Sequence, residues 1–79
     1  MVYYANMASN QSEKIRKELG EKLKKAREEE KLTQEEVSKK TGIHVNYYAR
    51  IERGEINTSY EKVYKIAEVL KVKILQIIK

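Results

Sequence analysis

Residues 32–54 read LTQEEVSKKTGIHVNYYARIERG, and this stretch contains the signals that decide the fold. Thr33 is followed three residues later by Glu36, which is the spacing of a capping box at the start of a helix. Gly42 and Gly54 can each take the left-handed conformation that commonly ends a helix. The stretch therefore predicts two short helices joined by a glycine turn, which is a helix-turn-helix.

The rest of the chain also favours helices, because proline is absent and the strong helix formers Glu and Lys are abundant. A second capping box, with Thr58 as the cap and Glu61 at its third helical position, opens a helix after the helix-turn-helix. The predicted helices cover about residues 12–30, 34–40, 44–53, 59–70 and 74–78. Their inward stripes are Ile15, Leu19, Leu23 and Ala26 in the first helix and Tyr60, Val63, Ile66, Ala67 and Leu70 in the fourth. These patterns predict an all-α fold of five helices.

The composition limits the kinds of function that the chain can have. It has 79 residues, a net charge of +5, one histidine and no cysteine. This length fits one domain held by its hydrophobic core, and a single histidine without cysteine cannot hold a structural zinc ion. A surplus of Lys and Arg suits contact with phosphate groups. We predict no enzyme activity, no cofactor, no metal and no small-molecule effector, because the residue patterns of such sites are missing.

The first twelve residues, MVYYANMASNQS, have neither the basic segment nor the apolar run of a signal peptide. We interpret residues 1–12 as a disordered N-terminal arm or as a remnant of an expression vector, with the folded domain in residues 13–79. No apolar run approaches the ~20 residues of a membrane span. The lack of both an export signal and cysteine favours the cytoplasm.

Positions within the helix-turn-helix divide into an inner and an outer set. Val37 fits the buried side of its first helix, and Ser38 is small enough for the second helix to approach. We expect Ile43, Tyr48 and Ile51 to face inward and to anchor the second helix. The outward positions are His44, Val45, Asn46, Tyr47, Ala49 and Arg50. This largely polar outer face, together with the positive net charge, points to DNA.

The segments LTQEEVSKKTGI, YYARIERG and NTSYEKVYKIAEVLKV resemble the helix-turn-helix of phage-repressor-like (Cro/repressor type) transcriptional regulators. The resemblance runs without a gap from about residue 19 to residue 78, and it implies a five-helix, lambda-repressor-like DNA-binding domain. The spacing H-x-x-Y-Y-x-x-I-E-R-G-x-x-N-x-S is also similar to that of small controller proteins of restriction–modification systems.

The resemblance implies roles for individual residues. The residues that it places at base edges in the major groove are His44, Val45, Asn46 and Arg50. The residues that it places at the DNA backbone are Gln34, Tyr47, Arg53 and Asn57, with Lys39 and Lys40 flanking them. Arg27 and Glu52 match a buried, structural ion pair of the family. The residue types agree with these roles, since arginine can read guanine and asparagine can read adenine.

The chain departs from the family pattern at four positions. Lys31 and Lys71 stand where glycine is usual or common, and Thr58 stands where proline usually opens the fourth helix. His44 stands where serine or threonine usually caps the recognition helix. We therefore expect a weaker or a different cap there, which leaves the first base contact open.

The last predicted helix has more apolar residues than one face can hold. The resemblance explains Ile74, Ile77 and Ile78 as core or near-core residues, and Leu75 is then a surplus apolar group. We predict a homodimer interface formed by Val72, Leu75 and Ile78, and simple closure of the core is the alternative. The complete prediction is a sequence-specific, double-stranded DNA-binding transcriptional regulator that binds a pseudo-palindromic operator as a homodimer.

Other interpretations stay open at this stage. The fold could serve mainly to hold a partner protein, as in an antitoxin or a bridging adaptor. Binding at a promoter could exclude polymerase, as a repressor does, or recruit it. Tyr47 and Tyr48 as a stacking pair for single strands, and His44 as a pH switch or metal ligand, are less well supported than core packing and DNA contact.

Overall fold

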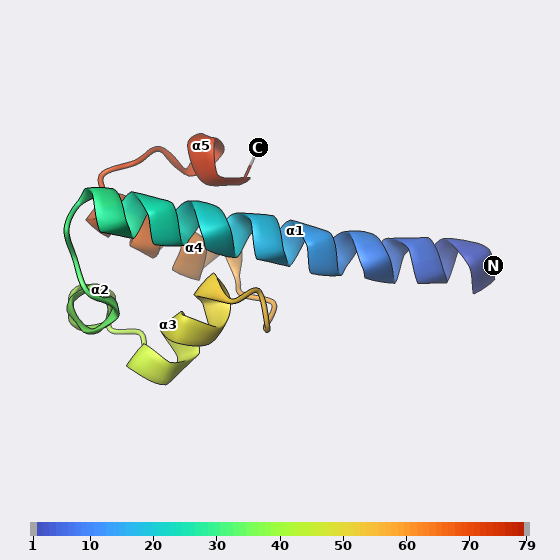
Figure 1. Cartoon of the computed structure of the whole chain (residues 1–79), viewed down its shortest axis with the longest axis horizontal. Coiled ribbons are helices and arrows are strands. Elements are labelled where there is room, and N and C mark those ends of the chain that lie inside the picture. The colour runs from blue at the N-terminus through green and yellow to red at the C-terminus, as the bar shows by residue number, and fades with distance from the viewer. Residues whose placement is uncertain (1, 79) are drawn as a thin grey trace.

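The computed structural model describes the backbone of residues 2–78 and the side chains of residues 12–77. Its helices are α1 (Val2–Glu29), α2 (Gln34–Thr41), α3 (Val45–Glu52), α4 (Tyr60–Val69) and α5 (Ile74–Ile78) (Figure 1). Residues 2–78 contain no strand, so the predicted all-α fold is confirmed. The predicted helix boundaries agree with the observed ones to within one residue, except at the start of α1. Within the described part of the chain, no helix is both long enough and apolar enough to cross a membrane.

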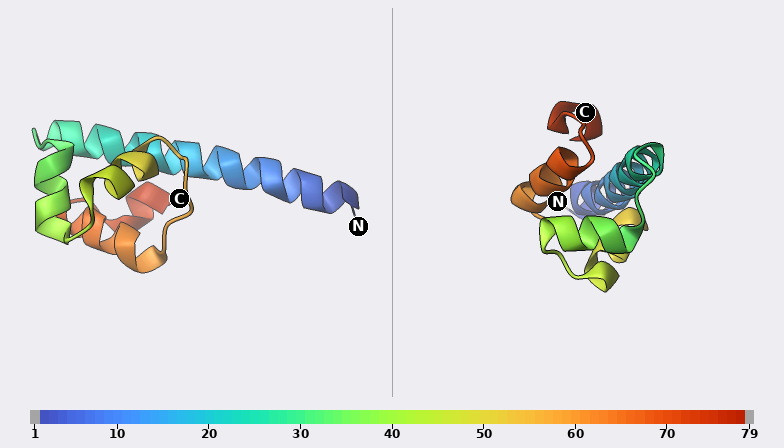
Figure 2. Two further views of the ribbon diagram at one scale, coloured as in Figure 1. Left: turned by 90° about the horizontal axis from the view of Figure 1, so that it is seen from below. Right: turned by 90° about the vertical axis from the view of Figure 1, so that its left-hand side faces the viewer.

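The helix α1 is the longest element, and the other helices pack along its C-terminal half (Figures 1 and 2). It contacts α3 on one side and α5 on the other. The helix α2 packs against α3 and α4, and α4 packs against α5, which closes the bundle around one core. The first turns of α1 extend beyond the other helices, as Figure 1 shows.

The start of α1 differs from the sequence-based expectation. The helix begins at Val2 and so includes residues 2–12, whereas we interpreted residues 1–12 as a disordered arm or a remnant of an expression vector. The physical reason is local, because no proline or glycine precedes Gly20 and because Ala5 and Ala8 favour the helix. Once the packed half of α1 has formed, each preceding residue can add to it without a new nucleation step.

The core follows the predicted apolar stripes with two exceptions. The buried apolar residues are Leu23, Ala26, Val37, Ile43, Tyr48, Ile51, Val63, Ile66, Ala67, Leu70 and Ile77. Ile15 was predicted to be inward but is 62% exposed. The contact between α1 and the end of α3 begins at Arg16, so Ile15 lies just outside the packed part of α1. Tyr60 was also predicted to be inward but is 60% exposed, because it is the first residue of α4 and lies at the edge of the bundle.

The residues that cap α2 are the predicted ones, whereas the cap of α4 differs from the prediction. Thr33 Oγ1 accepts a hydrogen bond from the Glu36 N–H (3.0 Å), and a Glu36 carboxylate oxygen accepts one from the Thr33 N–H (2.8 Å). The predicted capping box of α2 is therefore present, and Gly42 ends this helix with a φ of 78°. The cap of α4 is Ser59 rather than Thr58, because the hydroxyl of Thr58 is turned into the protein and buried.

Two lysines take the left-handed conformation that the family usually assigns to glycine. Lys31, after α1, has a φ of 58°, and Lys71, after α4, has a φ of 61°. The backbone turn survives at both sites, since the following N–H groups of Leu32 and Val72 donate back to the preceding helices. A side chain in this conformation costs roughly 1–2 kcal/mol per residue, so both turns are maintained at some expense in stability.

The helix α1 and the end of α3 approach each other so closely that both contribute a glycine. A Cβ atom at Gly20 would lie 2.3 Å from the carbonyl oxygen of Glu52, and one at Gly54 would lie 2.8 Å from the Cα of Lys17. Gly54 also has a φ of 71°, which disfavours other residues. Arg16 Nε adds a hydrogen bond to the Gly54 carbonyl oxygen at 3.4 Å. This contact positions α3, whose outer face is the candidate site.

Candidate nucleic-acid interface

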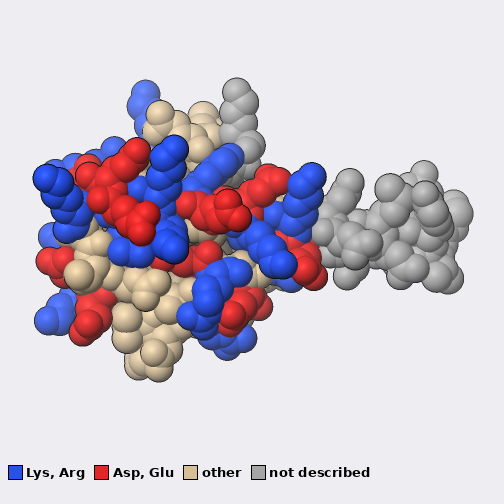
Figure 3. Space-filling view, in the orientation of Figure 1, with Lys and Arg blue, Asp and Glu red and all other residues tan. Residues whose placement is uncertain are grey.

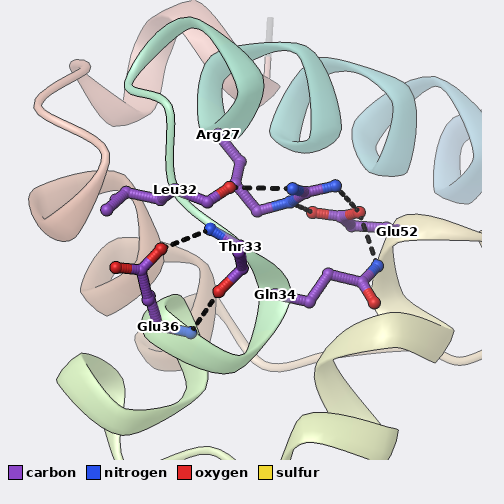
Figure 4. Close-up of polar contacts among 6 residues, drawn as sticks. All are labelled: Arg27, Leu32, Thr33, Gln34, Glu36 and Glu52. Atoms are coloured by element: carbon purple, nitrogen blue, oxygen red, sulfur yellow. Dashed lines mark hydrogen bonds and ion pairs between the residues drawn. The ribbon is translucent and has the colours of Figure 1, made fainter.

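The inner face of α3 is anchored by apolar side chains and by one buried ionic network. Tyr48 and Ile51 are 0% and 2% exposed and pack into the core, as predicted. At the end of the helix, the Glu52 carboxylate accepts hydrogen bonds from Arg27 Nε (2.8 Å) and Nη2 (3.1 Å) (Figure 4). Gln34 Nε2 donates to the same carboxylate at 2.9 Å. These bonds join α1, α2 and α3 at one point and thereby fix the geometry of the helix-turn-helix.

The surroundings of Glu52 keep its carboxylate ionised, although its side chain is only 2% exposed. Burial alone would raise the pKa of Glu52, but the hydrogen bonds that it accepts from Arg27 and Gln34 outweigh burial and hold the pKa below its usual value. Arg27 Nη1 also donates to the Leu32 carbonyl oxygen at 2.9 Å, which ties down the chain just before α2. Burial, and next the neighbouring Glu52 carboxylate, raise the pKa of Tyr48, so its phenol stays neutral.

The outer face of α3 begins at His44, which is exposed and caps the helix. Its Nδ1 accepts a hydrogen bond from the Asn46 N–H at 3.1 Å, so an imidazole makes the cap where the family usually has a hydroxyl. Because this bond uses Nδ1, Nε2 is the ring nitrogen that remains for a further hydrogen bond. Asn46 is exposed next to it, and the half-buried Val45 lines a surface depression together with Gln34.

The two neighbouring tyrosines of α3 have different surroundings. Tyr48 is buried in the core, whereas Tyr47 is half-buried and packs on the edge of the core. Lys62 Nζ from α4 lies 4.9 Å from the centroid of the Tyr47 ring, which is within the range of a cation–π contact. Only one of the two rings therefore reaches the surface, and it brings a cation from α4 to the outer face of α3.

The end of α3 carries two arginines that share one carboxylate. Arg53 Nε and Nη2 donate to Glu55 at 2.6 Å and 3.2 Å, and Arg50 Nε lies 3.5 Å from a Glu55 oxygen. All three side chains are about half exposed. The hydrogen bonds from Arg53, and next its charge, hold the pKa of Glu55 below its usual value. Figure 3 shows basic and acidic side chains side by side over this region, whereas the surface at the start of α3 is mostly uncharged.

The other residues that were predicted to contact the DNA backbone lie in three places. Gln34 and Arg53 line one surface groove of about 450 Å³, and so do Lys17 and Lys24 of α1. Lys39 and Lys40 are exposed in the last turn of α2, and they do not line this groove. Asn57 is exposed in the segment between α3 and α4. The cations at the groove and those on α2 thus offer two separate contacts for phosphate groups.

Two residues of this region were missed by the sequence analysis. Glu55 is the partner of Arg50 and Arg53, and Lys62 is the partner of Tyr47. Glu55 could have been noticed, because it lies just after the glycine that ends α3 and thus close to the last turn of that helix. Lys62 gave no such signal, since it comes from a different helix.

The C-terminal end of the bundle has an apolar surface of its own. Leu75 is 68% exposed, and Tyr64 is 47% exposed. Both residues line a groove of about 340 Å³, as does the half-buried Val72. Ile77 is buried, as expected of a core residue. The side chain of Ile78, the third residue of the predicted dimer interface, lies outside the described residues.

Comparison with known proteins agrees with this geometry. The model of a helix-turn-helix protein family matches residues 23–77 of the chain. The chain belongs to the Cro/repressor-type helix-turn-helix family. It is also similar to the uncharacterized HTH-type transcriptional regulator y4dJ of Sinorhizobium fredii, with 33% identity over 64 residues that cover 81% of this chain and 83% of that protein. Members of the family are DNA-binding transcriptional regulators and not enzymes.

Proposed function

We propose that this protein is a sequence-specific transcriptional regulator that binds a pseudo-palindromic operator in double-stranded DNA as a homodimer. In this proposal, α3 enters the major groove, and Asn46 and Arg50 read base edges with His44 and Val45 beside them. Gln34, Tyr47 and Asn57 contact the DNA backbone, and Lys39 and Lys40 add flanking phosphate contacts. Arg53 lies beside the backbone, while Glu55 holds its guanidinium group.

The observation that carries this proposal is the division of α3 into two faces. Tyr48, Ile51 and the buried Glu52 fix one face to the rest of the domain. The other face presents two exposed side chains, Asn46 and Arg50, that can make paired hydrogen bonds to a base. A rigid helix with such an outer face suits base reading, because its side chains start from fixed backbone positions.

The proposed dimer rests on the apolar groove at the end of the bundle. Leu75 and Tyr64 are large apolar side chains that are about half exposed or more, and they line one groove. A second copy of the chain would cover the same groove on both subunits, as a two-fold axis requires. Such a dimer binds half-sites whose centres lie about one turn of DNA (~34 Å) apart.

Selection of duplex DNA from a random pool, at near-physiological salt, tests the proposed DNA recognition. We expect the pool to converge on a palindrome with half-sites one turn apart. A pool that stays random would contradict sequence-specific binding and would leave phosphate attraction as the only DNA contact. Capture of a partner protein would then be the next experiment, since an antitoxin or adaptor uses the same fold mainly for protein contact.

The substitution Leu75→Lys tests the dimer interface. It places a charge in the apolar groove, so we expect sedimentation to show a dimer dissociation constant at least about tenfold higher than in the wild type. Tyr60→Lys is the matched control, because Tyr60 is similarly exposed and lies outside this groove. Unchanged sedimentation of Leu75→Lys at micromolar concentration would place the interface elsewhere.

A further inference from the structure

Glu55 is held in place by the turn that ends α3. The Gly54 N–H donates to the Ile51 carbonyl oxygen (3.0 Å), and the Glu55 N–H donates to the Arg50 carbonyl oxygen (3.0 Å). These two bonds, with Gly54 in the left-handed conformation, form a Schellman motif. The backbone of Glu55 is therefore fixed relative to the last turn of α3, and its carboxylate stays within reach of the arginines on that turn.

The carboxylate engages the two arginines differently. It accepts from both Nε and Nη2 of Arg53, which uses two of the three nitrogens of that guanidinium. It meets Arg50 through Nε alone, at 3.5 Å. Among residues 12–77, no side chain hydrogen-bonds to the two Nη nitrogens of Arg50. Those two nitrogens form the donor pair that suits guanine O6 and N7.

We propose that Glu55 is a specificity-determining residue, which positions Arg50 for base reading and withdraws Arg53 from the phosphates of non-specific DNA. This inference rests on the proposed function, because it concerns the ratio between operator binding and random DNA binding. Glu55 itself touches no base in this proposal. It acts through the two arginines that it holds.

The reason for this proposal is that random DNA and the operator provide different contacts to the two arginines. Random DNA is bound through phosphate groups alone, so an arginine tied to a carboxylate is lost to that binding mode, and the carboxylate also repels the phosphates. The operator offers a base edge to Arg50, whose donor pair stays free while Nε remains with Glu55. The carboxylate disfavours phosphate contact on both kinds of DNA, but on the operator this cost is offset because the carboxylate also positions Arg50 for the base edge. It therefore weakens binding to random DNA more than binding to the operator.

The substitution Glu55→Gln tests this proposal, because glutamine keeps the size of the side chain but not its charge. The probes are the duplex recovered from the random pool and a scrambled duplex of equal length, titrated at several salt concentrations. We expect affinity for the scrambled duplex to rise about fivefold, and the slope of log affinity against log salt to steepen by about one unit, as for one added phosphate contact. Affinity for the operator should change by less than about threefold, so the specificity ratio falls.

Two matched variants separate this effect from a general change in charge. Glu29→Gln makes the same change in net charge at an exposed site at the end of α1, and it should leave the specificity ratio unchanged. In an Arg53→Ala background, Glu55→Gln should raise affinity for the scrambled duplex by less than about twofold, because only the repulsion of phosphates is relieved and no arginine is released. An equal gain on both duplexes, or a gain that is equally large without Arg53, would overturn the proposal.

The experiment also distinguishes failure of this inference from failure of the proposed function. A wild type that binds operator candidates and scrambled duplexes equally overturns the proposed sequence-specific regulator. The scrambled-duplex arm still reports on Glu55 in that case, because release of Arg53 steepens the salt dependence with or without an operator. An unchanged slope in Glu55→Gln overturns the role of Glu55 alone.

Discussion

Glu52 and Glu55 lie only three residues apart at the end of α3, and each accepts two hydrogen bonds from one arginine. Their surroundings are opposite. The side chains of Arg27 and Glu52 are 12% and 2% exposed, whereas those of Arg53 and Glu55 are 57% and 45% exposed. The inner pair also bonds to Gln34 and to the chain before α2, while the outer pair is shared with a second arginine.

This comparison shows that the same chemical pair has different consequences on the two sides of one helix. In the buried pair, loss of one partner leaves a charge without water to solvate it, so breaking the pair strongly destabilises the fold. In the exposed pair, water and salt replace a lost partner at little cost, so its energy is small. The outer pair can therefore be opened by a substitution without unfolding the domain, whereas the inner pair cannot.

The largest expected effect comes from breaking the inner pair. Arg27→Ala leaves the buried Glu52 unpaired and should lower the free energy of unfolding by ~3–5 kcal/mol, measured by urea denaturation. Arg53→Ala is the matched control, because it breaks the outer pair, and its unfolding midpoint should stay within error of the wild type.

If Arg27→Ala does not fold at all, replacing both partners of the pair still tests whether an unpaired buried charge causes the loss of stability. Arg27→Met with Glu52→Leu removes both charges and should recover most of the stability, since the cost arises from the unpaired charge and not from the absence of the pair. Equal losses in Arg27→Ala and Arg53→Ala would contradict the contrast between the two sides of α3.

The second prediction moves α3 away from α1 without changing a charged residue. In Gly20→Ala the new methyl group would lie 2.3 Å from the Glu52 carbonyl oxygen, so α1 and α3 must move apart. We expect a loss of about 1–3 kcal/mol in the free energy of unfolding, as is typical of overpacking. Glu21→Ala, at the exposed neighbouring position, is the control and should be close to neutral. A neutral Gly20→Ala would mean that α3 is not held closely to α1.

The fold was largely predictable because its signals are local. The capping box at Thr33, the glycine at Gly42 and the apolar period of each helix act within a few residues, and they gave the helix boundaries almost throughout. The exceptions depend on distant neighbours. Ile15 fits its stripe but lies beyond the packed part of α1, and the role of Gly20 depends on the backbone of α3.

The outward positions of α3 could be predicted from the sequence, but the partners of their side chains within the protein could not. The resemblance indicated the outward residues of α3 and the Arg27–Glu52 pair, which is present in the structure. Sequence spacing could not show that Glu55 reaches both Arg50 and Arg53, because this depends on the direction in which the turn at the end of α3 sends the chain. Ion pairs within the protein decide which hydrogen-bond donors remain available to DNA. These pairs could be identified only from the structure.

The third prediction distinguishes Glu52 from Glu55 by how the stability that each contributes depends on pH. The pKa of Glu52 is lower in the folded protein than in the unfolded chain, so its contribution to stability is fully present above the unfolded value of about 4.3 and is lost as pH falls through the folded value. The difference in free energy of unfolding between the wild type and Glu52→Gln should therefore be largest at neutral pH and shrink below about pH 4. The pKa of Glu55 is lowered too, but its pair is exposed and screened, so Glu55→Gln should show the same trend with a much smaller difference from the wild type. A constant difference between the wild type and Glu52→Gln down to acid unfolding would show that Glu52 is not held as an ion.

The smallest expected effect is the coupling within the outer pair. A double-mutant cycle of Arg53→Ala and Glu55→Gln, read by thermal unfolding at low salt, should give only a small coupling, because both side chains are about half exposed. Any residual coupling should vanish in about 1 M salt, where charges are screened beyond ~3 Å. A large coupling that survives this salt would mean that the outer pair is as fixed as the inner one, and it would contradict the contrast between the two sides of α3.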